Sequence, residues 1–389
     1  MTTEQIQPMR MTILGATGSI GCSTADVMLQ HPDKFSAFAL VGHRNTDKML
    51  ELATLLQPQW VVMTDANAAK ALVGKLPAGV RLESGMDAAI TLASATETDM
   101  VMAAMVGSAG LPATLAAVQA GKRVGLANKE CLVTAGQIFM REAKKSGALV
   151  VPVDSEHAAV HQCLVGHDHA SISQVILTAS GGPFRDRDPK TLHAVTPEEA
   201  IAHPNWDMGA KISVDSATMM NKALELIEAR WLFDIEPGKL SAIIHPESII
   251  HGMVEYIDGS VLAQLAMPDM RMPIAYAMQV QPRLHTGIPW LDLAKTGQLN
   301  FQAIDNERFP AMRLVQDVLK GEDSLAIALN AANEVANAAF RNREIGFMDI
   351  VTTVEAVLQQ VDNIPVDSLN DVWSHDANAR ALAAAALNG

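Results

Sequence analysis

Short apolar runs alternate with segments of helical periodicity along the first part of the chain. The runs that we interpret as strands lie at residues 11–14, 35–41, 60–63, 81–82, 100–104, 123–127 and 149–153. Apolar residues at helical spacing follow the first run as far as Gln30, and an alanine-rich helical segment at 111–120 follows the fifth. This alternation predicts a doubly wound, mostly parallel sheet with 149–153 as its last strand.

The pattern changes after Val165. Residues 174–178 are strand-like, and two further runs at 249–256 and 261–265 are joined through Asp258-Gly259, which is a strong hairpin signal. An antiparallel pair of this kind does not belong to the first sheet. It predicts a second domain of the α+β class.

Helical periodicity dominates the C-terminal part of the chain and predicts a small helical bundle. The segments concerned are 310–320, 324–340, 347–361 and 377–387. The second of them carries polar groups at 330–334 inside an otherwise apolar pattern. A stretch rich in Pro and Gly precedes them and is expected to be a linker. The sequence therefore predicts a first α/β domain at 1–153, an α+β domain at 154–280, a linker at 281–309 and a helical domain at 310–389.

Composition narrows the class of protein. The chain has 389 residues, 49% hydrophobic and 19% charged, so it is globular and long enough for two or three domains. Its formal net charge of −14 argues against nucleic acid as a partner, whereas a phosphorylated small molecule needs only a local site. Three scattered cysteines and a polar N-terminus without a signal peptide predict a cytoplasmic protein. The uncharged stretch 100–121 is interrupted by glycine and proline, so no membrane span is expected.

A glycine-rich run from Gly15 to Gly21 lies where the first strand meets the first helix. Backbone N–H groups at such a turn can bind a pyrophosphate, so this βαβ unit predicts a Rossmann-like dinucleotide-binding domain. The next strand ends at Gly42 and is followed by Arg44, without the acid that binds the ribose of NAD. NADPH is therefore favoured. The alternative is that Arg44 belongs to a solvated basic turn.

Two carboxylates follow the last predicted strand. If Asp154 and Glu156 continue that strand, they point to the same face, with Ser155 on the other. Two anions on one face repel each other unless a cation lies between them, which suggests a divalent metal. The alternative is a helix start, with Asp154 or Ser155 as the cap and Glu156 in the first turn of a helix that reaches Leu164.

Other polar residues occur where ligands bind in α/β folds. Lys129 follows the strand at 123–127 and would face the same crevice as the cofactor. The small-residue turn 179–183 could bind an anion, or could be only a tight turn. The loop 202–209 is irregular but contains Trp206, which suits a lid that excludes water.

A helix is expected over 217–230, with an unusual number of hydroxyl groups before it. Asn221, Lys222 and Glu225 lie on one flank of this helix. The alternative for that flank is an exposed face with a Lys–Glu pair, worth about 0.2 to 0.5 kcal/mol. His245 and His251 are interpreted as hydrogen-bonded structural histidines.

With these motifs in order, the chain resembles the 1-deoxy-D-xylulose 5-phosphate reductoisomerase family over nearly its whole length. The motifs that carry the resemblance are Gly15-Ala-Thr-Gly-Ser-Ile-Gly21, Leu126-Ala-Asn-Lys-Glu130, Pro152-Val-Asp-Ser-Glu-His157, Ser180-Gly-Gly-Pro-Phe-Arg185, His203-Pro-Asn-Trp-Asp-Met-Gly209 and Lys211-Ile-Ser-Val-Asp-Ser-Ala-Thr-Met-Met-Asn-Lys222. The resemblance implies a homodimer whose subunit has an NADPH domain, a central catalytic domain and a C-terminal helical bundle. One departure is His43, which could alter contacts with the adenosine.

The resemblance also implies roles for single residues. The metal ligands would be Asp154, Glu156 and Glu225, with Lys129 as a further catalytic residue. The substrate would be bound by Ser155, Glu156, Ser180, His203, Trp206, Ser216, Asn221, Lys222 and Glu225. NADPH would be bound by Thr17, Gly18, Ser19, Ile20, Gly42, Arg44, Asn45, Asn128, Glu130 and Gly209. Trp206 and Met208 would belong to a closing flap.

The chemistry of these residues suits the implied reaction. An oxygen-only donor set favours a hard cation such as Mg2+ or Mn2+ over zinc, and Co2+ is a third possibility. The family rearranges 1-deoxy-D-xylulose 5-phosphate by retro-aldol cleavage and aldol recombination, and then reduces the product to 2-C-methyl-D-erythritol 4-phosphate with NADPH. This is a step of the non-mevalonate isoprenoid pathway.

Three rival interpretations stay open at this point. A semialdehyde-type dehydrogenase would use Cys131 as a nucleophile, although the neighbouring acid does not lower a thiol pKa. A zinc hydrolase would use His157, His161 and Cys163, although the usual His-Glu-x-x-His pattern is absent. A regulator that binds the cofactor without catalysis is the third.

Overall fold

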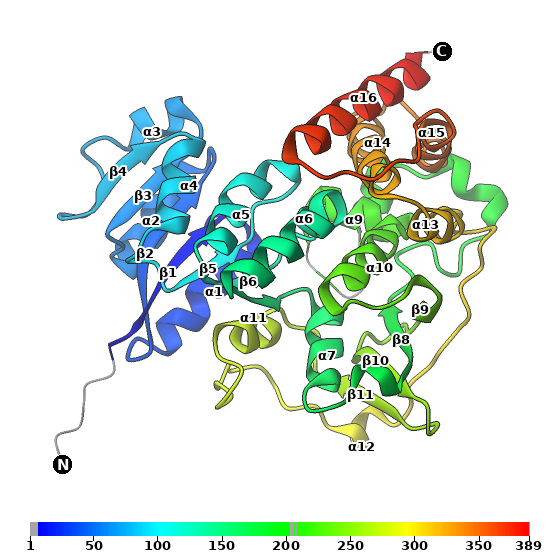
Figure 1. Ribbon diagram of the computed structural model, residues 1–389, viewed down its shortest axis with the longest axis horizontal. Coiled ribbons are helices and arrows are strands. Elements are labelled where there is room, and N and C mark those ends of the chain that lie inside the picture. Colours follow the sequence, from blue (N-terminus) through cyan, green and yellow to red (C-terminus); the bar gives the residue numbers. More distant parts are fainter. Residues whose placement is uncertain (1–6, 203–205, 207, 389) are drawn as a thin grey trace. The chain divides into compact units, whose positions relative to one another are not determined.

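The computed structural model describes residues 7–202, 206 and 208–388 (Figure 1). The chain divides into two compact units, each assembled from separate stretches of sequence. The first consists of Met1–Cys131, Arg141–Ala158 and Asp269–Ile288, and the second of Leu132–Met140, Ala159–Pro268 and Pro289–Gly389. The boundaries predicted from the sequence are finer than this division and stay predictions.

The first unit is built on a seven-stranded sheet in which every pair of neighbouring strands is parallel. Its strands are β1 (Met9–Leu14), β2 (Phe35–Gly42), β3 (Trp60–Met63), β4 (Arg81–Ser84), β5 (Met100–Ala103), β6 (Arg123–Leu126) and β7 (Leu149–Pro152). The spatial order is β4-β3-β2-β1-β5-β6-β7, so the chain winds outward from β1 in both directions. The predicted doubly wound sheet is confirmed, and β7 lies at its edge.

Helices between the strands cover this sheet and bury an apolar core that includes Met11, Ile13 and Met102. They are α1 (Ser19–Gln30), α2 (Thr46–Leu56), α3 (Ala66–Leu72), α4 (Met86–Ser94), η1 (Ser108–Gly110) and α5 (Leu111–Gln119). Two longer helices, α6 (Glu130–Ser146) and α7 (Ser155–Leu164), contain residues of both units. The uncharged stretch at 100–121 forms β5, η1 and α5. Within the described part of the chain, no helix is long and apolar enough to cross a membrane.

One helix of the first unit comes from much later in the chain. α11 (Arg271–Met278) packs on α1, β6 and β7, and its residues Ile274, Tyr276 and Met278 are buried in the core of the first sheet. The guanidinium Nε of Arg123 donates to the carbonyl of Ala277 at 2.9 Å. The sequence pattern did not predict this return, because α11 is separated from β7 by more than a hundred residues.

The second unit contains a four-stranded sheet in the order β11-β10-β8-β9. Its strands are β8 (Ile172–Ala179), β9 (Leu240–Ile244), β10 (Ile250–Tyr256) and β11 (Val261–Leu265). β10 and β11 form the predicted antiparallel hairpin, and Gly259 at its turn has φ +83°. β9 was not predicted. It pairs in parallel with β8, which makes this a mixed sheet within an α+β unit.

Helices make up the rest of the second unit, and among them α14 packs against α15 and α16 (Figure 1). They are η2 (His169–Ser171), η3 (Pro189–Ala194), α8 (Pro197–Ile201), α9 (Ala210–Ala217), α10 (Met220–Phe233), η4 (Pro237–Lys239), α12 (Leu293–Thr296), α13 (Ala311–Lys320), α14 (Asp323–Arg341), α15 (Asp349–Leu358) and α16 (Leu369–Asn388). The four predicted C-terminal helices are confirmed, but α16 begins eight residues earlier than expected. Ser368 and Asp371 bond each other's side chains and backbone N–H groups there, which is a helix-start signal that the apolar pattern does not show.

Candidate active site

The glycine turn between β1 and α1 has the close backbone packing of a nucleotide-binding loop. Gly15 has φ +82°, and a Cβ atom there would lie 2.3 Å from the carbonyl oxygen of Ala104. A Cβ atom on Gly21 would lie 2.4 Å from the carbonyl of Gly15. Gly18 begins α1, and among the described residues no side chain caps this helix. Its first N–H groups are therefore available to an anion such as a pyrophosphate.

The end of β2 lies beside this turn. A Cβ atom on Gly42 would come within 3.3 Å of the Thr17 side chain, so the two segments are in close contact. Arg44 follows with 75% of its side chain exposed, and its Nε donates to Asp65 at 3.0 Å. The pKa of Asp65 is lowered, first by the backbone N–H of Ala68 and then by Arg44. The exposed part of the guanidinium can reach a phosphate, and the role of Arg44 in binding NADPH stays a prediction.

Two neighbours of these residues have structural contacts of their own. Asn45 caps α2, because its Oδ1 accepts from the backbone N–H of Lys48 at 3.1 Å. His43 shares a hydrogen bond of 2.8 Å with the hydroxyl of Thr64. This hydrogen bond holds His43, which departs from the family pattern, next to the end of β3.

Polar residues follow β6, as the sequence predicted. Asn128 is buried, and its Nδ2 donates to the carbonyl of Gly107 at 3.0 Å while its Oδ1 has no partner among the described residues. Lys129 is also buried, and its Nζ lies 2.5 Å from Oδ2 of Asp154. Glu130 begins α6. The structure thus brings Lys129 and Asp154 together from the ends of neighbouring strands.

The expectation that Asp154 and Glu156 lie on one face of a strand is wrong. β7 ends at Pro152, and α7 begins at Ser155. The backbone carbonyl of Asp154 accepts from the N–H of Ala158, its Oδ1 accepts from the N–H of Ser155 at 3.1 Å, and Glu156 lies in the first turn. This is the helix start that was kept as the alternative, and it is favoured because carboxylates interact well with the positive end of a helix. The hydroxyl of Ser155 donates to Oε2 of Glu156 at 2.5 Å.

The turn after β8 is tight, as predicted. Gly181 and Gly182 have φ values of +80° and +65°, and the N–H of Gly182 donates to the hydroxyl of Ser180 at 3.1 Å. A Cβ atom on Gly182 would lie 2.9 Å from the carbonyl of Ser216 on α9, so the turn and that helix are packed closely. Anion binding by this turn stays a prediction.

The predicted lid falls largely outside the described residues. His203 lies outside the described residues, whereas Trp206 and Met208 are described. The ring of Trp206 lies 6.3 Å from the ring of His251. His251 is buried, and burial lowers its pKa to about 4. His245 accepts the N–H of Ile249 at 3.2 Å, as expected of a structural histidine.

The expected helix over 217–230 corresponds to α10, which begins three residues later, and a separate helix, α9, precedes it. α9 ends at Ala217, and α10 begins at Met220 after Met219, which has φ +62°. A non-glycine residue in the left-handed region costs energy and is typical of functional turns. The hydroxyl of Thr218 accepts the N–H of Met220 at 3.3 Å and so helps to start α10. The polar residues before 217 lie on a helix and are not a loose cap.

The flank formed by Asn221, Lys222 and Glu225 is not solvated. Glu225 is fully buried, and Lys222 is 3% exposed. Oε1 of Glu225 accepts from Nδ2 of Asn221, and Oε2 accepts from Nζ of Lys222. The alternative of an exposed helix pair is therefore wrong. The second unit therefore contains a buried carboxylate with donors on both oxygens.

The rival nucleophile is buried, and so are His157 and Cys163 of the rival zinc ligands, whereas His161 is half-buried. Cys131 is fully buried on α6. Burial raises the pKa of the Cys163 thiol to about 11 and lowers the pKa of His161. A thiol with a pKa that high is poorly suited to metal binding, since the thiolate is the ligand.

Together these features define an α/β protein with a nucleotide-binding sheet, acidic and cationic residues at the ends of two of its strands, and a second α+β unit that carries a buried carboxylate. Comparison with known proteins narrows this class. Residues 11–136 match the family described as 1-deoxy-D-xylulose 5-phosphate reductoisomerase, and residues 150–233 and 265–382 match two C-terminal domains of that enzyme. The chain belongs to this family.

Individual relatives agree along the whole chain. It is 51% identical over 385 residues to the 1-deoxy-D-xylulose 5-phosphate reductoisomerase of Pseudomonas paraeruginosa, covering 97% of each chain. The Burkholderia cenocepacia enzyme of the same name is also 51% identical, over 383 residues, 97% of this chain and 96% of the relative.

Two solved structures of reductoisomerases resemble the fold closely. One, from Zymomonas mobilis in complex with NADPH, has a TM-score of 0.91 at 43% identity and covers 98% of this chain and 99% of its own. The other, in complex with NADPH, fosmidomycin and magnesium, has a TM-score of 0.92 at 41% identity and covers 98% of both chains. The family resemblance and the fold class predicted from the sequence are thereby confirmed.

One group of residues escaped the sequence analysis. The polar groups at 330–334 were noted without a partner, and Asn337 was not singled out. Asn330, Asn333 and Asn337 follow the spacing of one helix face, where apolar residues are normally found. All three are fully buried, and the spacing of three asparagines on a core face was the signal available.

Proposed function

We propose that the chain is an NADPH- and divalent-metal-dependent enzyme that rearranges 1-deoxy-D-xylulose 5-phosphate and reduces the product to 2-C-methyl-D-erythritol 4-phosphate, in the non-mevalonate isoprenoid pathway. One observation carries this proposal, namely identity of 51% to enzymes of that name along 97% of the chain. The solved reductoisomerases in complex with NADPH and magnesium support the cofactors.

The residues of the first unit fit NADPH. The close packing of Gly15 and Gly21 leaves the backbone near Thr17, Gly18, Ser19 and Ile20 open to a pyrophosphate. Gly42 and Arg44 follow the next strand, where an arginine suits the extra phosphate of NADPH. Asn128 offers a buried amide oxygen without a partner among the described residues, which a nicotinamide carboxamide can satisfy. Asn45, Glu130 and Gly209 complete the proposed set.

The carboxylates fit a hard divalent cation. We assign Asp154, Glu156 and Glu225 as its ligands, and an all-oxygen donor set suits Mg2+, Mn2+ or Co2+. Both oxygens of Glu225 accept hydrogen bonds, from Asn221 and from Lys222. When bound, the ion supplies Lewis-acid stabilisation of the charge that develops on the substrate oxygens.

The remaining residues bind and orient the substrate. Lys129, whose Nζ is held by Asp154, presents an ammonium group that can stabilise or protonate a substrate oxygen, and Ser155 offers a hydroxyl to the same end. We assign the phosphate to Ser180, Ser216, Asn221 and Lys222, so that binding energy remote from the reacting bonds orients the substrate. His203 and Trp206 are assigned to the lid that excludes water.

We further propose a cytoplasmic homodimer. β11 is an edge strand of the second sheet, and 49% of Val261 and 37% of Leu262 are exposed along it. Trp290, from the same unit, is 90% exposed. An apolar edge strand favours pairing with a second copy of the chain. All three cysteines are free, which suits a reducing compartment.

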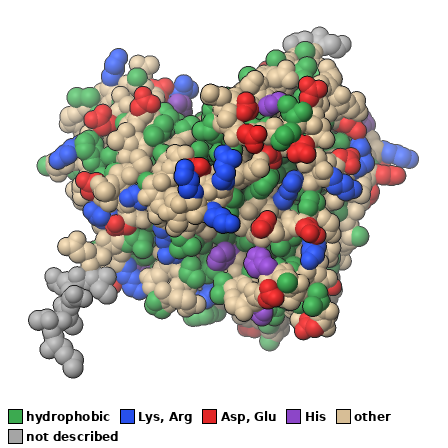
Figure 2. Space-filling view, viewed as in Figure 1, with side chains coloured by type: hydrophobic (Ala, Val, Ile, Leu, Met, Phe, Trp, Pro, Cys, Tyr) green, Lys and Arg blue, Asp and Glu red, His purple; other side chains and the backbone are tan. Residues whose placement is uncertain are grey.

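The acidic character of the chain agrees with a small-molecule substrate. On the face shown in Figure 2, acidic and basic side chains are interspersed, and no large field of one sign covers it. A phosphate is therefore bound by local groups, such as the cationic Lys222, and not by a general positive surface.

The test is an assay of NADPH absorbance with 1-deoxy-D-xylulose 5-phosphate, with and without Mn2+ or Mg2+. We expect absorbance to fall only when both substrate and metal are present, and activity to disappear after chelation. Turnover that survives a chelator, or an absence of turnover with every metal, would refute the proposal. Activity that is retained in Cys131→Ala separates this enzyme from the cysteine-dependent rival, and any turnover excludes a regulator without catalysis.

A further inference from the structure

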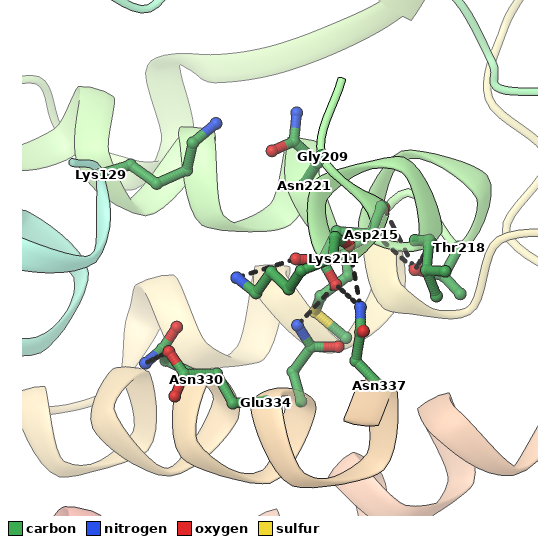
Figure 3. A network of polar contacts seen from close by, with 12 residues as sticks. Lys129, Gly209, Lys211, Asp215, Thr218, Asn221, Asn330, Glu334 and Asn337 are labelled. Atoms are coloured by element: carbon green, nitrogen blue, oxygen red, sulfur yellow. Dashed lines mark hydrogen bonds and ion pairs between the residues drawn. The ribbon is translucent and has the colours of Figure 1, made fainter. Parts of the chain in front are cut away.

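A buried polar cluster joins α9 to α14 (Figure 3). Asp215 is 1% exposed, and its Oδ1 accepts from Nδ2 of Asn333 at 2.9 Å and from Nδ2 of Asn337 at 2.8 Å. Nδ2 of Asn337 also donates to the backbone carbonyl of Lys211 at 3.0 Å. We call Asp215, Asn333 and Asn337 the α9 clamp. It holds α9 to α14 at two points that are one helical turn apart.

The clamp is not what a core built only for stability would contain. A buried carboxylate and two buried amides lose their hydration, and apolar residues of similar volume often serve stability as well or better. Oδ1 of Asn333 has no hydrogen-bond partner among the described residues, which adds to the cost. Hydrogen bonds are directional, however, and so fix the rotation and the register of α9 in a way that apolar contacts do not.

Lys211 completes the cluster from the side of α9. Its Nζ lies 2.9 Å from Oδ2 of Asp215, so both oxygens of this carboxylate are occupied. On the side of α14, Oδ1 of Asn337 accepts from Nε of Arg341 at 2.8 Å, which fixes the orientation of the amide. The amide hydrogens of Asn337 must then face Asp215 and Lys211.

The order of residues along the chain shows which groups the clamp positions. Ser216 is the next residue after Asp215, so its backbone moves with the clamped helix. Gly182 packs on the carbonyl of Ser216, which ties the turn that contains Ser180 to the same helix. Beyond the Met219 turn, α10 starts immediately and carries Lys222 in its first turn. The groups assigned to the phosphate therefore all depend on where α9 lies.

We propose that Asp215, Asn333 and Asn337 are positioning residues for phosphate binding, and that α14 thereby sets the affinity of the enzyme for its phosphorylated substrate. This inference rests on the proposed function. The clamp touches neither substrate nor cofactor and acts through the placement of Ser216 and Lys222.

The experiment compares variants of the same helix. Asn333→Leu removes one clamp bond. Asp215→Asn keeps an acceptor oxygen and almost the same volume, but removes the negative charge of the shared acceptor and its ion pair with Lys211. Asn330→Leu is the matched control, because Asn330 is equally buried on α14 but its Nδ2 donates to Glu334 at 3.3 Å, within the same helix. Each protein is assayed for the KM of the ketose phosphate, kcat, the inhibition constant of inorganic phosphate and the dissociation constant of NADPH without substrate.

We expect both clamp variants to raise the KM of the ketose phosphate and the inhibition constant of inorganic phosphate roughly 10-fold, as for loss of a buried hydrogen bond to a charged group. The dissociation constant of NADPH should change less than about twofold, because its binding groups lie mainly in the first unit, and Asn330→Leu should leave all constants near wild type.

Folded clamp variants with the wild-type KM and phosphate constant would overturn the proposal, as would equal changes in Asn330→Leu. If Asn333→Leu does not fold, the Asp215→Asn variant alone tests the positioning role. If the wild type does not convert the ketose phosphate, the proposed function fails, and a 31P NMR titration with inorganic phosphate still tests the clamp. In that case, equal phosphate affinity of Asp215→Asn and wild type refutes the positioning role.

Discussion

Replacing Lys222 with methionine distinguishes a buried ion pair from an ordinary helix pair. Lys222 and Glu225 are three residues apart on α10, and their side chains are 4% and 1% exposed. An exposed pair at this spacing contributes about 0.2 to 0.5 kcal/mol. Removing one partner of a buried pair instead costs about 3 to 5 kcal/mol, because an uncompensated charge stays inside. Methionine keeps the volume of the lysine stem, so packing changes little.

The expected change is large enough to measure by thermal unfolding. For a unit of this size, 1 kcal/mol shifts Tm by about 2 to 4 °C, so Lys222→Met should lower the transition of the second unit by roughly 10 °C. Because the chain has two compact units, the transition is followed by calorimetry and not by a single two-state fit. Loss of the ammonium group should also raise the KM for the phosphorylated substrate.

A matched control is provided by the first unit. Lys48 and Glu51 have the same spacing and an Nζ–Oε2 distance of 2.7 Å, but their side chains are 36% and 54% exposed. Lys48→Met should shift Tm by less than about 2 °C, since exposed pairs contribute little. Equal shifts in the two variants would show that burial does not set the strength of the Lys222 pair, and the reasoning would fail.

The other predictions concern the metal, the cofactor, the lid and the response to pH. Glu225→Gln should weaken metal-supported turnover more than NADPH binding, and an unchanged Mn2+ titration would exclude it as a ligand. Arg44→Asp should raise the dissociation constant of NADPH, measured by fluorescence, and an undiminished affinity would leave Arg44 as a surface residue only. Trp206→Ala should raise the KM for substrate in steady-state assays, and wild-type values would reject a lid. The pKa of His251 is about 4 in the folded protein, against an ordinary value of 6.5. As the pH falls, the unfolded state therefore takes up a proton at this residue before the folded state does. Stability should therefore fall by about 3 kcal/mol between pH 6.5 and 4, and a His251→Gln variant with the same loss over that window would contradict this account.

Local signals predicted much of the fold. The strands of the first sheet are short, apolar and bounded by turn residues, and the glycine run at Gly15 could be placed at a strand end because backbone packing there excludes a side chain. The hairpin at Gly259 was predicted for the same kind of reason, since a positive φ favours glycine. The residues assigned to the site from the family motifs stay predictions, although the contacts of Lys129 and Glu225 are in keeping with them.

The failures have different physical causes, some local and some set by distant parts of the chain. Asp154 looked like the end of a strand, but its oxygens serve the start of α7. Helix propensity does not predict the break at Met219, which has φ +62° and a buried side chain. Asp215 received no role from the sequence pattern, because its partners Asn333 and Asn337 lie 118 and 122 residues further along.

The placement of α11 has a consequence for synthesis on the ribosome. Ile274, Tyr276 and Met278 complete the core of a sheet whose last strand ended at Pro152. The nascent first unit therefore exposes an apolar surface until residues 269–288 have left the exit tunnel. During that interval the growing polypeptide is a natural client for chaperones, and fragments truncated near residue 150 should accumulate as aggregates.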